Sequence, residues 1–117
     1  MPENALRDFH LIPFENGVRM GTPTVMINSG HLNGVPGHAN RRLLTEILKE
    51  EFNFDGFVVS DWEDIKRLYT RDKVAATLEE AARIAVLAGV DMSMVPFDYS
   101  FLDHCISLTK KSAEFAR

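Results

Sequence analysis

Several features that would assign this chain to a specialised class are missing from its 117 residues. Cys105 is the only cysteine, so no intrachain disulfide can form. No apolar run approaches the roughly 20 residues that a membrane-spanning helix needs, and we expect no membrane partner. The first ten residues lack the basic-then-apolar order of a signal peptide. The net charge of −4 argues against a nucleic-acid partner, which would require clustered positive charge.

The composition that remains is that of an ordinary globular protein. Hydrophobic residues make up 45% of the chain and charged residues 26%, which excludes low-complexity disorder. Cys105 lies among Leu102, Ile106 and Thr109 at helical spacing, which favours a small buried side chain over a reactive thiol. His31 and His38 share one loop, but a metal site would need two further ligands. We therefore expect neither a metal nor another cofactor.

Short apolar segments separated by helical patterns predict an α/β fold. Strands are expected at residues 24–28, 57–60 and 90–95. Helices are expected around residues 13–20, 43–52, 78–88 and 101–116, with another shortly after residue 62. Thr77 is the expected N-cap of the 78–88 helix, which Gly89 closes, and Ser100 is the expected N-cap of the last helix. Strands that alternate with helices imply right-handed βαβ units and a parallel sheet.

Three strands are too few for a closed barrel, which needs eight. The chain begins and ends beside expected helices and contains no internal repeat. We expect residues 1–117 to be a piece of a larger domain, a partial (β/α)8 barrel of about three parallel βα units. Strand residues 57–59 would then be half-uncovered, so the isolated chain should self-associate or form a poorly packed monomer. A sharply two-state monomer would contradict this expectation.

Candidate chemistry lies where the strands end, because functional groups gather at the C-terminal ends of parallel strands. Asp61 follows the 57–60 strand directly, and Trp62 offers an aromatic face of the kind that stacks on sugars. An aspartate in this position is also a common helix N-cap, and the pattern alone leaves both roles open. Glu63 and Asp64 are expected to begin the next helix, where acids suit the helix dipole. Asp91 is expected to be buried and hydrogen-bonded in a structural role.

Residues 56–62 read GFVVSDW, which resembles the nucleophile signature of glycoside hydrolase family 3. The resemblance extends over further segments in the family's order: TVMINS at 24–29, NGVPGHAN at 33–40, LLTEILK at 43–49 and AGVDM at 88–92. It implies that the chain is the C-terminal part of the family's N-terminal barrel domain. The expected parent enzyme is a retaining β-glycosidase that hydrolyses terminal β-linked glucosyl or xylosyl residues of an oligosaccharide or other β-glycoside.

By that resemblance, Asp61 attacks the anomeric carbon and forms a covalent intermediate that water hydrolyses with retention of configuration. Retention needs a second carboxyl group about 5–5.5 Å away. Two-domain members take it from a later domain, so we expect this chain alone to be inactive. Trp62 would line the aglycone side and Met26 would lie near the sugar. Ser29, which replaces a tyrosine common in the family, is the third expected substrate-binding residue. A periplasmic or extracellular location follows from the resemblance alone.

Three other interpretations were weighed. A β-N-acetylhexosaminidase of the same family is one alternative, but such members tend to lack a tryptophan after the nucleophile, so Trp62 favours the glucosidase or xylosidase branch. An inert structural piece without ligand affinity is compatible with the resemblance. A phosphoacceptor receiver domain shares the length and the alternation of elements. It requires an acidic pair and a lysine at strand ends where this chain has Asn28-Ser29 and residues 94–96, so we reject it.

Overall fold

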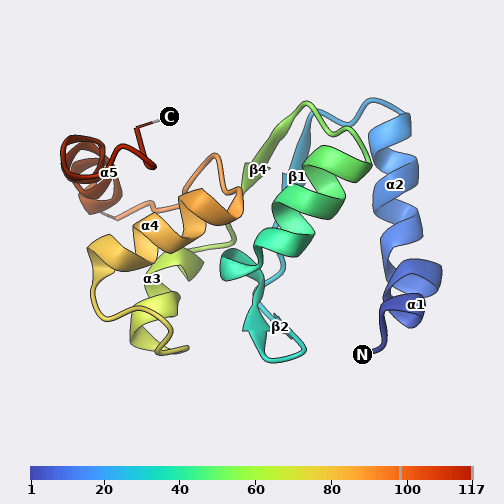
Figure 1. Ribbon diagram of the computed structural model, residues 1–117, viewed down its shortest axis with the longest axis horizontal. Coiled ribbons are helices and arrows are strands. Elements are labelled where there is room, and N and C mark those ends of the chain that lie inside the picture. Colours follow the sequence, from blue (N-terminus) through green and yellow to red (C-terminus); the bar gives the residue numbers. More distant parts are fainter. Residues whose placement is uncertain (98, 117) are drawn as a thin grey trace.

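The computed structural model describes residues 1–97 and 99–116, and its helices and parallel strands alternate along the chain (Figure 1). In order, the elements are α1 (Glu3–Ala5), η1 (Leu6–Leu11), α2 (Ile12–Arg19), β1 (Thr24–Met26), β2 (His31–Leu32), β3 (Val35–Pro36), η2 (Gly37–Ala39), η3 (Arg42–Glu51), β4 (Phe57–Val59), α3 (Asp64–Thr70), α4 (Leu78–Ala88) and α5 (Ser100–Lys111). The predicted α/β fold is confirmed.

β1 and β4 form a parallel sheet in which Thr24 pairs with Phe57 and Met26 with Val59. On the other side of β4, Met92 makes a single parallel bridge to Val59. The predicted strand at 90–95 is therefore wrong as a strand, because the described part of this segment pairs at one residue only. The ladder does not continue at Met94, because the Met94 amide donates to the Ser60 side chain instead of a strand carbonyl.

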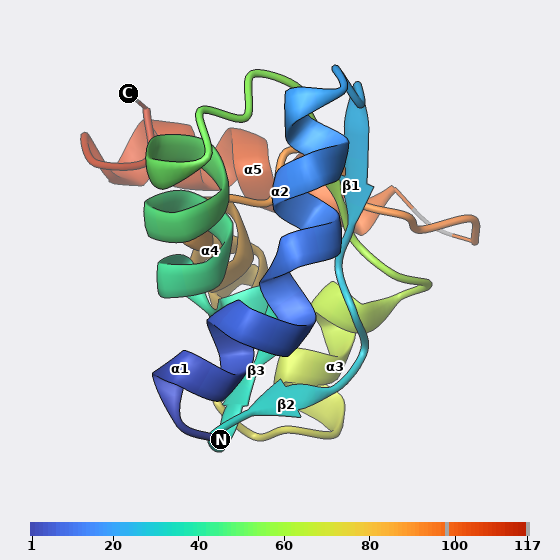
Figure 2. The ribbon, with the colours of Figure 1, turned by 90° about the vertical axis from the view of Figure 1, so that its right-hand side faces the viewer.

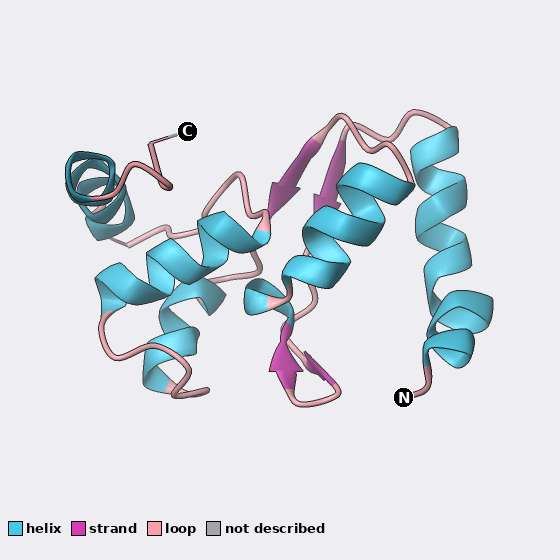
Figure 3. Cartoon of the chain, in the orientation of Figure 1, coloured by secondary structure: helices cyan, strands magenta, loops and turns pink. Residues whose placement is uncertain are grey.

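A small antiparallel hairpin, β2 with β3, rises from the loop after β1 (Figure 3). Its turn residues Asn33 and Gly34 both have positive φ, of 50° and 84°. Two consecutive left-handed residues suit the right-handed twist of a hairpin, and asparagine and glycine adopt that conformation at the lowest cost. The hairpin brings the chain back beneath β1, where η2 begins.

The helices follow one another side by side along the long axis of the molecule, from α1 and α2 at one end to α5 at the other (Figure 1). Figure 2 shows α1 leading into α2 as one bent helical rod. The buried residues of α4 are all alanines, namely Ala81, Ala82, Ala85 and Ala88, and the partly buried Ile84 packs against the same core. Small side chains let α4 approach its neighbours closely, and the buried Val58 and Leu68 complete that core.

The ends of α4 follow the prediction. The Thr77 hydroxyl accepts a hydrogen bond from the Glu80 amide at 3.0 Å, as an N-cap does. Gly89 has a φ of 122°, and a Cβ there would lie 2.8 Å from the Thr45 hydroxyl oxygen. Glycine therefore permits both the left-handed turn and the contact with η3, where Thr45 donates to the Ala88 carbonyl at 2.8 Å.

The bounds of α5 differ from the prediction. Ser100 is the first helical residue and Tyr99 the N-cap, so the predicted cap is wrong by one position. The helix ends at Lys111, because Ser112 is extended with φ −134° and ψ 117°. Cys105, which was expected to be buried, is half-buried on this helix, and burial raises the pKa of its thiol.

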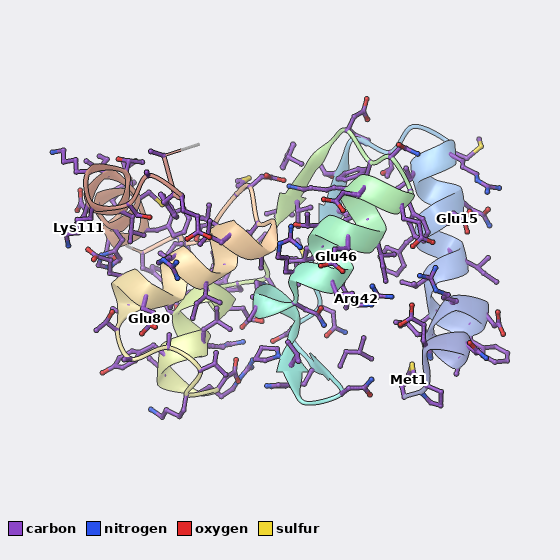
Figure 4. All side chains as sticks on the ribbon, viewed as in Figure 1. Met1, Glu15, Arg42, Glu46, Glu80 and Lys111 are labelled. Carbon is purple, nitrogen blue, oxygen red and sulfur yellow. The ribbon has the colours of Figure 1, made fainter. Side chains whose placement is uncertain are left out.

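Ion pairs fasten the N-terminal helices to η3. Arg42 on η3 bonds both Glu3 and Glu46, and Figure 4 shows Arg42 and Glu46 on this helix. The Arg7 guanidinium contacts the Glu51 carboxylate through two hydrogen bonds of 2.6 and 3.0 Å. These exposed pairs add little stability individually, and Val18 of α2 also packs against the hydrophobic core.

Candidate functional site

The turn that follows β4 carries Asp61 and is fixed on one side by residues 92–94. Ser60 is buried, and its amide donates to the Met92 carbonyl at 2.9 Å. Its hydroxyl accepts from the Met94 amide at 2.8 Å. The Glu63 amide donates to the Met94 carbonyl at 3.0 Å, so both flanks of Asp61 are held by the same neighbouring segment.

The Asp61 carboxylate is partly exposed at the C-terminal edge of the parallel segments. Its Oδ1 accepts a hydrogen bond from the Trp62 amide at 2.7 Å, while its backbone carbonyl accepts from the Asp64 amide at 3.2 Å. The N-cap of α3 is Glu63, which has a left-handed φ of 54°. Asp61 therefore does not cap α3, and this carboxylate faces the edge at which the sequence predicted chemistry.

Two apolar side chains predicted to contact substrate lie at this edge. Trp62 is 46% exposed and meets Phe97 edge-on, with ring centroids 5.7 Å apart and an interplanar angle of 78°. Met26 is half-exposed at the end of β1, and it leaves the sheet on the same face as its partner Val59. The structure thus leaves both side chains accessible, and their contacts with substrate stay predictions.

Ser29, the third predicted contact residue, is engaged by two arginines. Its hydroxyl accepts from Arg67 Nη1 and Arg71 Nη1, each at 3.4 Å. Its carbonyl accepts from Arg71 Nη2 at 3.1 Å. Ser29 thereby joins the loop after β1 to α3 and the turn that follows it, and a role toward substrate stays a prediction.

His38 is the residue at this site that sequence reasoning missed. Its side chain is buried, and its Nε2 accepts a hydrogen bond from the Asp61 amide at 3.0 Å. Burial lowers the pKa of His38, and the nearby Asp64 and Asp61 carboxylates oppose that shift. The neutral form is the one that can accept this hydrogen bond. The only available signal was the pattern of glycine and proline before His38, which marks a tight turn and not its partner.

Asp64 begins α3 as predicted, and its side chain is buried, which the sequence pattern did not indicate. Its Oδ1 bonds Arg67, and its Oδ2 lies 3.9 Å from His38 Nδ1. The predicted burial of Asp91 is wrong, because its side chain is 39% exposed. Its hydrogen bonding is as predicted, with bonds from the Val58 amide and Lys49 Nζ. Asp91 is exposed because the segment around it forms no full strand.

Two negative findings concern residues 1–97 and 99–116. Within these ranges, no group of three or more histidine, cysteine, aspartate or glutamate side chains is arranged to hold a metal ion. The helices in the same ranges are all too short or too polar to cross a bilayer.

Comparisons with known proteins give a consistent result. The sequence profile of the glycosyl hydrolase family 3 N terminal domain matches residues 1–114. A lysosomal beta glucosidase of Dictyostelium discoideum is 46% identical over 102 residues, which cover 86% of this chain and 12% of that protein. A beta-xylosidase of Formosa agariphila is 46% identical over 96 residues, which cover 81% of this chain and 13% of that protein. The chain therefore spans about an eighth of the length of these relatives.

Solved structures agree with the sequence relatives. A β-glucosidase from Erythrobacter marinus superposes with a TM-score of 0.81 at 33% identity, over 86% of this chain and 13% of that one. The complex of a Listeria innocua β-glucosidase with isofagomine gives a TM-score of 0.86 at 26% identity, over 97% of this chain and 16% of that one. With the profile match over residues 1–114, these likenesses confirm the resemblance seen in the sequence: the chain belongs to glycosyl hydrolase family 3, within its N-terminal domain.

Proposed function

We propose that this chain supplies the nucleophile and part of the sugar site of a retaining β-glycosidase that acts on terminal β-linked glucosyl or xylosyl residues. The observation that carries the proposal is the position of Asp61, a partly exposed carboxylate on the turn directly after a buried parallel strand. Active sites of α/β barrels form at this edge. The relatives named as β-glucosidases and a β-xylosidase support the substrate class.

The domain proposal follows from the same relatives. Residues 1–117 would form the C-terminal part of the family's N-terminal barrel domain, in which β1, β4 and the segment at Met92 are three of eight parallel strands. The parallel register of β1 with β4 and the parallel bridge at Met92 support this arrangement. A relative named as a periplasmic beta-glucosidase, from Salmonella typhimurium, supports a location outside the cytoplasm for the whole protein.

The proposed reaction has two steps. In the first, Asp61 attacks the anomeric carbon, an acid from outside this chain protonates the leaving oxygen, the glycosidic bond breaks and an ester to Asp61 forms. In the second, the same outside group takes a proton from water, which attacks the anomeric carbon and releases Asp61. The Trp62 amide holds Oδ1, so we assign the attack to Oδ2. Without the outside group, the 117 residues alone are expected to be inactive.

A covalent-labelling experiment tests this function. The chain, joined to flanking sequence so that it reaches the length of its relatives, is incubated with an activated 2-deoxy-2-fluoro-β-glucoside and digested for peptide mass mapping. The expected result is a fluoroglucosyl group on Asp61. Label on another carboxylate would sink the assignment. Turnover of an N-acetyl-β-glucosaminide alone would favour the hexosaminidase alternative, and neither label nor turnover with any glycoside would favour an inert structural piece.

Replacing Trp62 tests the sugar site separately. Trp62→Ala is expected to raise KM for p-nitrophenyl β-glucoside about fivefold with little change in kcat, because one aromatic contact contributes roughly 1 kcal/mol. Trp62→Phe should retain most of the affinity. Tyr69→Ala is the matched control, since this exposed aromatic residue lies on α3 over Lys73. An unchanged KM in Trp62→Ala would remove Trp62 from the proposed site.

A further inference from the structure

The backbone amides around β4 alternate between its two neighbours. On the β1 side, the Phe57 amide donates to the Pro23 carbonyl at 3.2 Å, and the Ile27 amide donates to the Val59 carbonyl at 3.0 Å. On the other side, the Ser60 amide donates to the Met92 carbonyl at 2.9 Å. By this alternation the amide of Asp61 points toward the β1 side. The sheet has already ended there, because the chain leaves β1 and enters a loop.

The His38 ring takes the place that a strand carbonyl would have. Its Nε2 accepts the Asp61 amide at 3.0 Å, so this amide is paired although the neighbouring strand is missing. η2 returns to this position because the Gly37 amide donates to the Gly30 carbonyl at 3.0 Å. Gly37 also packs against the Asn28 carbonyl so closely that a Cβ would lie 2.6 Å from its oxygen. Glycine before His38 is therefore needed for the ring to reach Asp61.

The surroundings of His38 favour the tautomer that this bond requires. Because Nε2 accepts, the ring proton lies on Nδ1, which faces Asp64 Oδ2 at 3.9 Å. This oxygen is buried and has no hydrogen bond to any residue in the described ranges. Arg67 fixes the other oxygen of Asp64. A buried carboxylate beside Nδ1 therefore stabilises the proton on that nitrogen and leaves Nε2 free to accept.

The charge state of the ring agrees with this arrangement. Burial is the largest effect and lowers the pKa of His38, and Arg71 acts in the same direction. Asp64, Asp61 and Asp72 act in the opposite direction. Protonation of Nε2 would place its N–H opposite the Asp61 backbone N–H, so that two donors would face each other. The net lowering of the His38 pKa keeps the ring neutral and able to accept this hydrogen bond.

We infer that His38 is a positioning residue for the proposed nucleophile, holding the Asp61 backbone through Nε2 while Asp64 orients its ring. The inference rests on the proposed function, because the place of Asp61 matters to the rate only if Asp61 reacts. An error of about 1 Å in the placement of a reacting group can lower a rate roughly 100-fold. His38 thus acts on the transition state through the backbone, and it need not touch the sugar.

Two substitutions separate this role from simple packing, in the protein extended to the length of its relatives. His38→Leu keeps bulk but removes the acceptor, and it is expected to lower kcat for p-nitrophenyl β-glucoside about 100-fold with KM changed less than about threefold. His38→Gln places an amide oxygen near the position of Nε2, and it should recover kcat to within about tenfold of wild type. A wild-type kcat in His38→Leu would overturn the inference.

Controls distinguish the possible failures. Ala82→Gly is the control for a general loss of stability, because it destabilises α4 at a buried position that is not part of the proposed site. This variant should leave kcat unchanged. Hydrogen–deuterium exchange of peptides spanning residues 57–62 should show faster exchange in His38→Leu and wild-type exchange in His38→Gln. A wild-type protein without glycosidase activity would sink the proposed function, while the exchange result would still test the bond itself.

His38→Asn is the reserve variant if His38→Leu does not fold. The asparagine amide ends near the position of Nδ1 and does not reach Asp61. The kcat of His38→Asn should therefore fall by about as much as the kcat of His38→Leu. Equal kcat values in the asparagine and glutamine variants would overturn the inference, because length would then not matter.

Discussion

Asp61→Ala is expected to lower kcat/KM for p-nitrophenyl β-glucoside by at least about 10⁴-fold, since removal of an activated nucleophile typically has effects of this order. The methyl group of alanine cannot form the glycosyl ester, and it also removes the oxygen that accepts the Trp62 amide at 2.7 Å. Steady-state kinetics of the protein at the length of its relatives measures the loss, with p-nitrophenyl β-xyloside as the second substrate.

Azide separates loss of the nucleophile from loss of the fold. Alanine leaves space beside the anomeric carbon, so azide should partly restore turnover of the variant and yield a glycosyl azide of inverted configuration. Asp55→Ala is the matched control, because Asp55 is exposed just before β4 and should be replaceable without loss of activity. Unchanged activity in Asp61→Ala would disprove its role, and the likeness to the family would then concern the fold alone.

Leu68→Ala is expected to cost about 2–5 kcal/mol of the free energy of unfolding, the usual range for a leucine truncated in a core. Leu68 is 0% exposed and anchors α3, a helix of seven residues whose other buried apolar side chain is Ile65. A short helix has little stability of its own, so the packing of its buried side chains provides most of its stability. Urea unfolding of the protein extended to the length of its relatives measures the loss as a lower midpoint at an unchanged slope of the transition that includes this domain.

Leu102→Ala on α5 is the matched control for this measurement. The side chain of Leu102 is 57% exposed, so its truncation should change stability by less than about 0.5 kcal/mol. Equal losses in the two variants would contradict the described core. A changed slope in Leu68→Ala would mean that the variant no longer unfolds between the same two states.

The sequence predicted correctly those helices and strands that are determined by residues close together in the chain. β4 was recognisable from its β-branched residues, and α4 from its alanine stripe with Thr77 and Gly89 at its ends. The segment at 90–95 was overestimated because its pairing depends on β4 and not on its own residues. Its amides at Asp91 and Met92 both donate to the Val58 carbonyl, so two residues share one acceptor. Among the described residues, the only bridge of this segment is that between Met92 and Val59.

The candidate site also contains features that local sequence predicts and features that depend on distant residues. Asp61 was placed correctly at a strand end because that position follows from the strand before it. The contact of His38 with Asp61 spans 23 residues, and the contact of Arg71 with Ser29 spans 42. Neither spacing has a periodic signal, so a single sequence cannot reveal these pairs. The burial of Asp64 was missed for the same reason, since it depends on the ring of His38 folding over it.

The hydrogen bonds that hold the Asp61 turn also affect the kinetics of folding. The hydrogen bond from the Asp61 amide to His38 closes a loop of 23 residues, and the bond from Met94 to Ser60 closes one of 34. Contacts so distant in sequence form later in folding than helices do, because loop closure costs entropy before it brings any stabilising contact. A refolding chain therefore acquires its helices while the Asp61 turn is still loose. We expect the geometry proposed for the nucleophile to form after the helices and to be lost when either distant segment detaches.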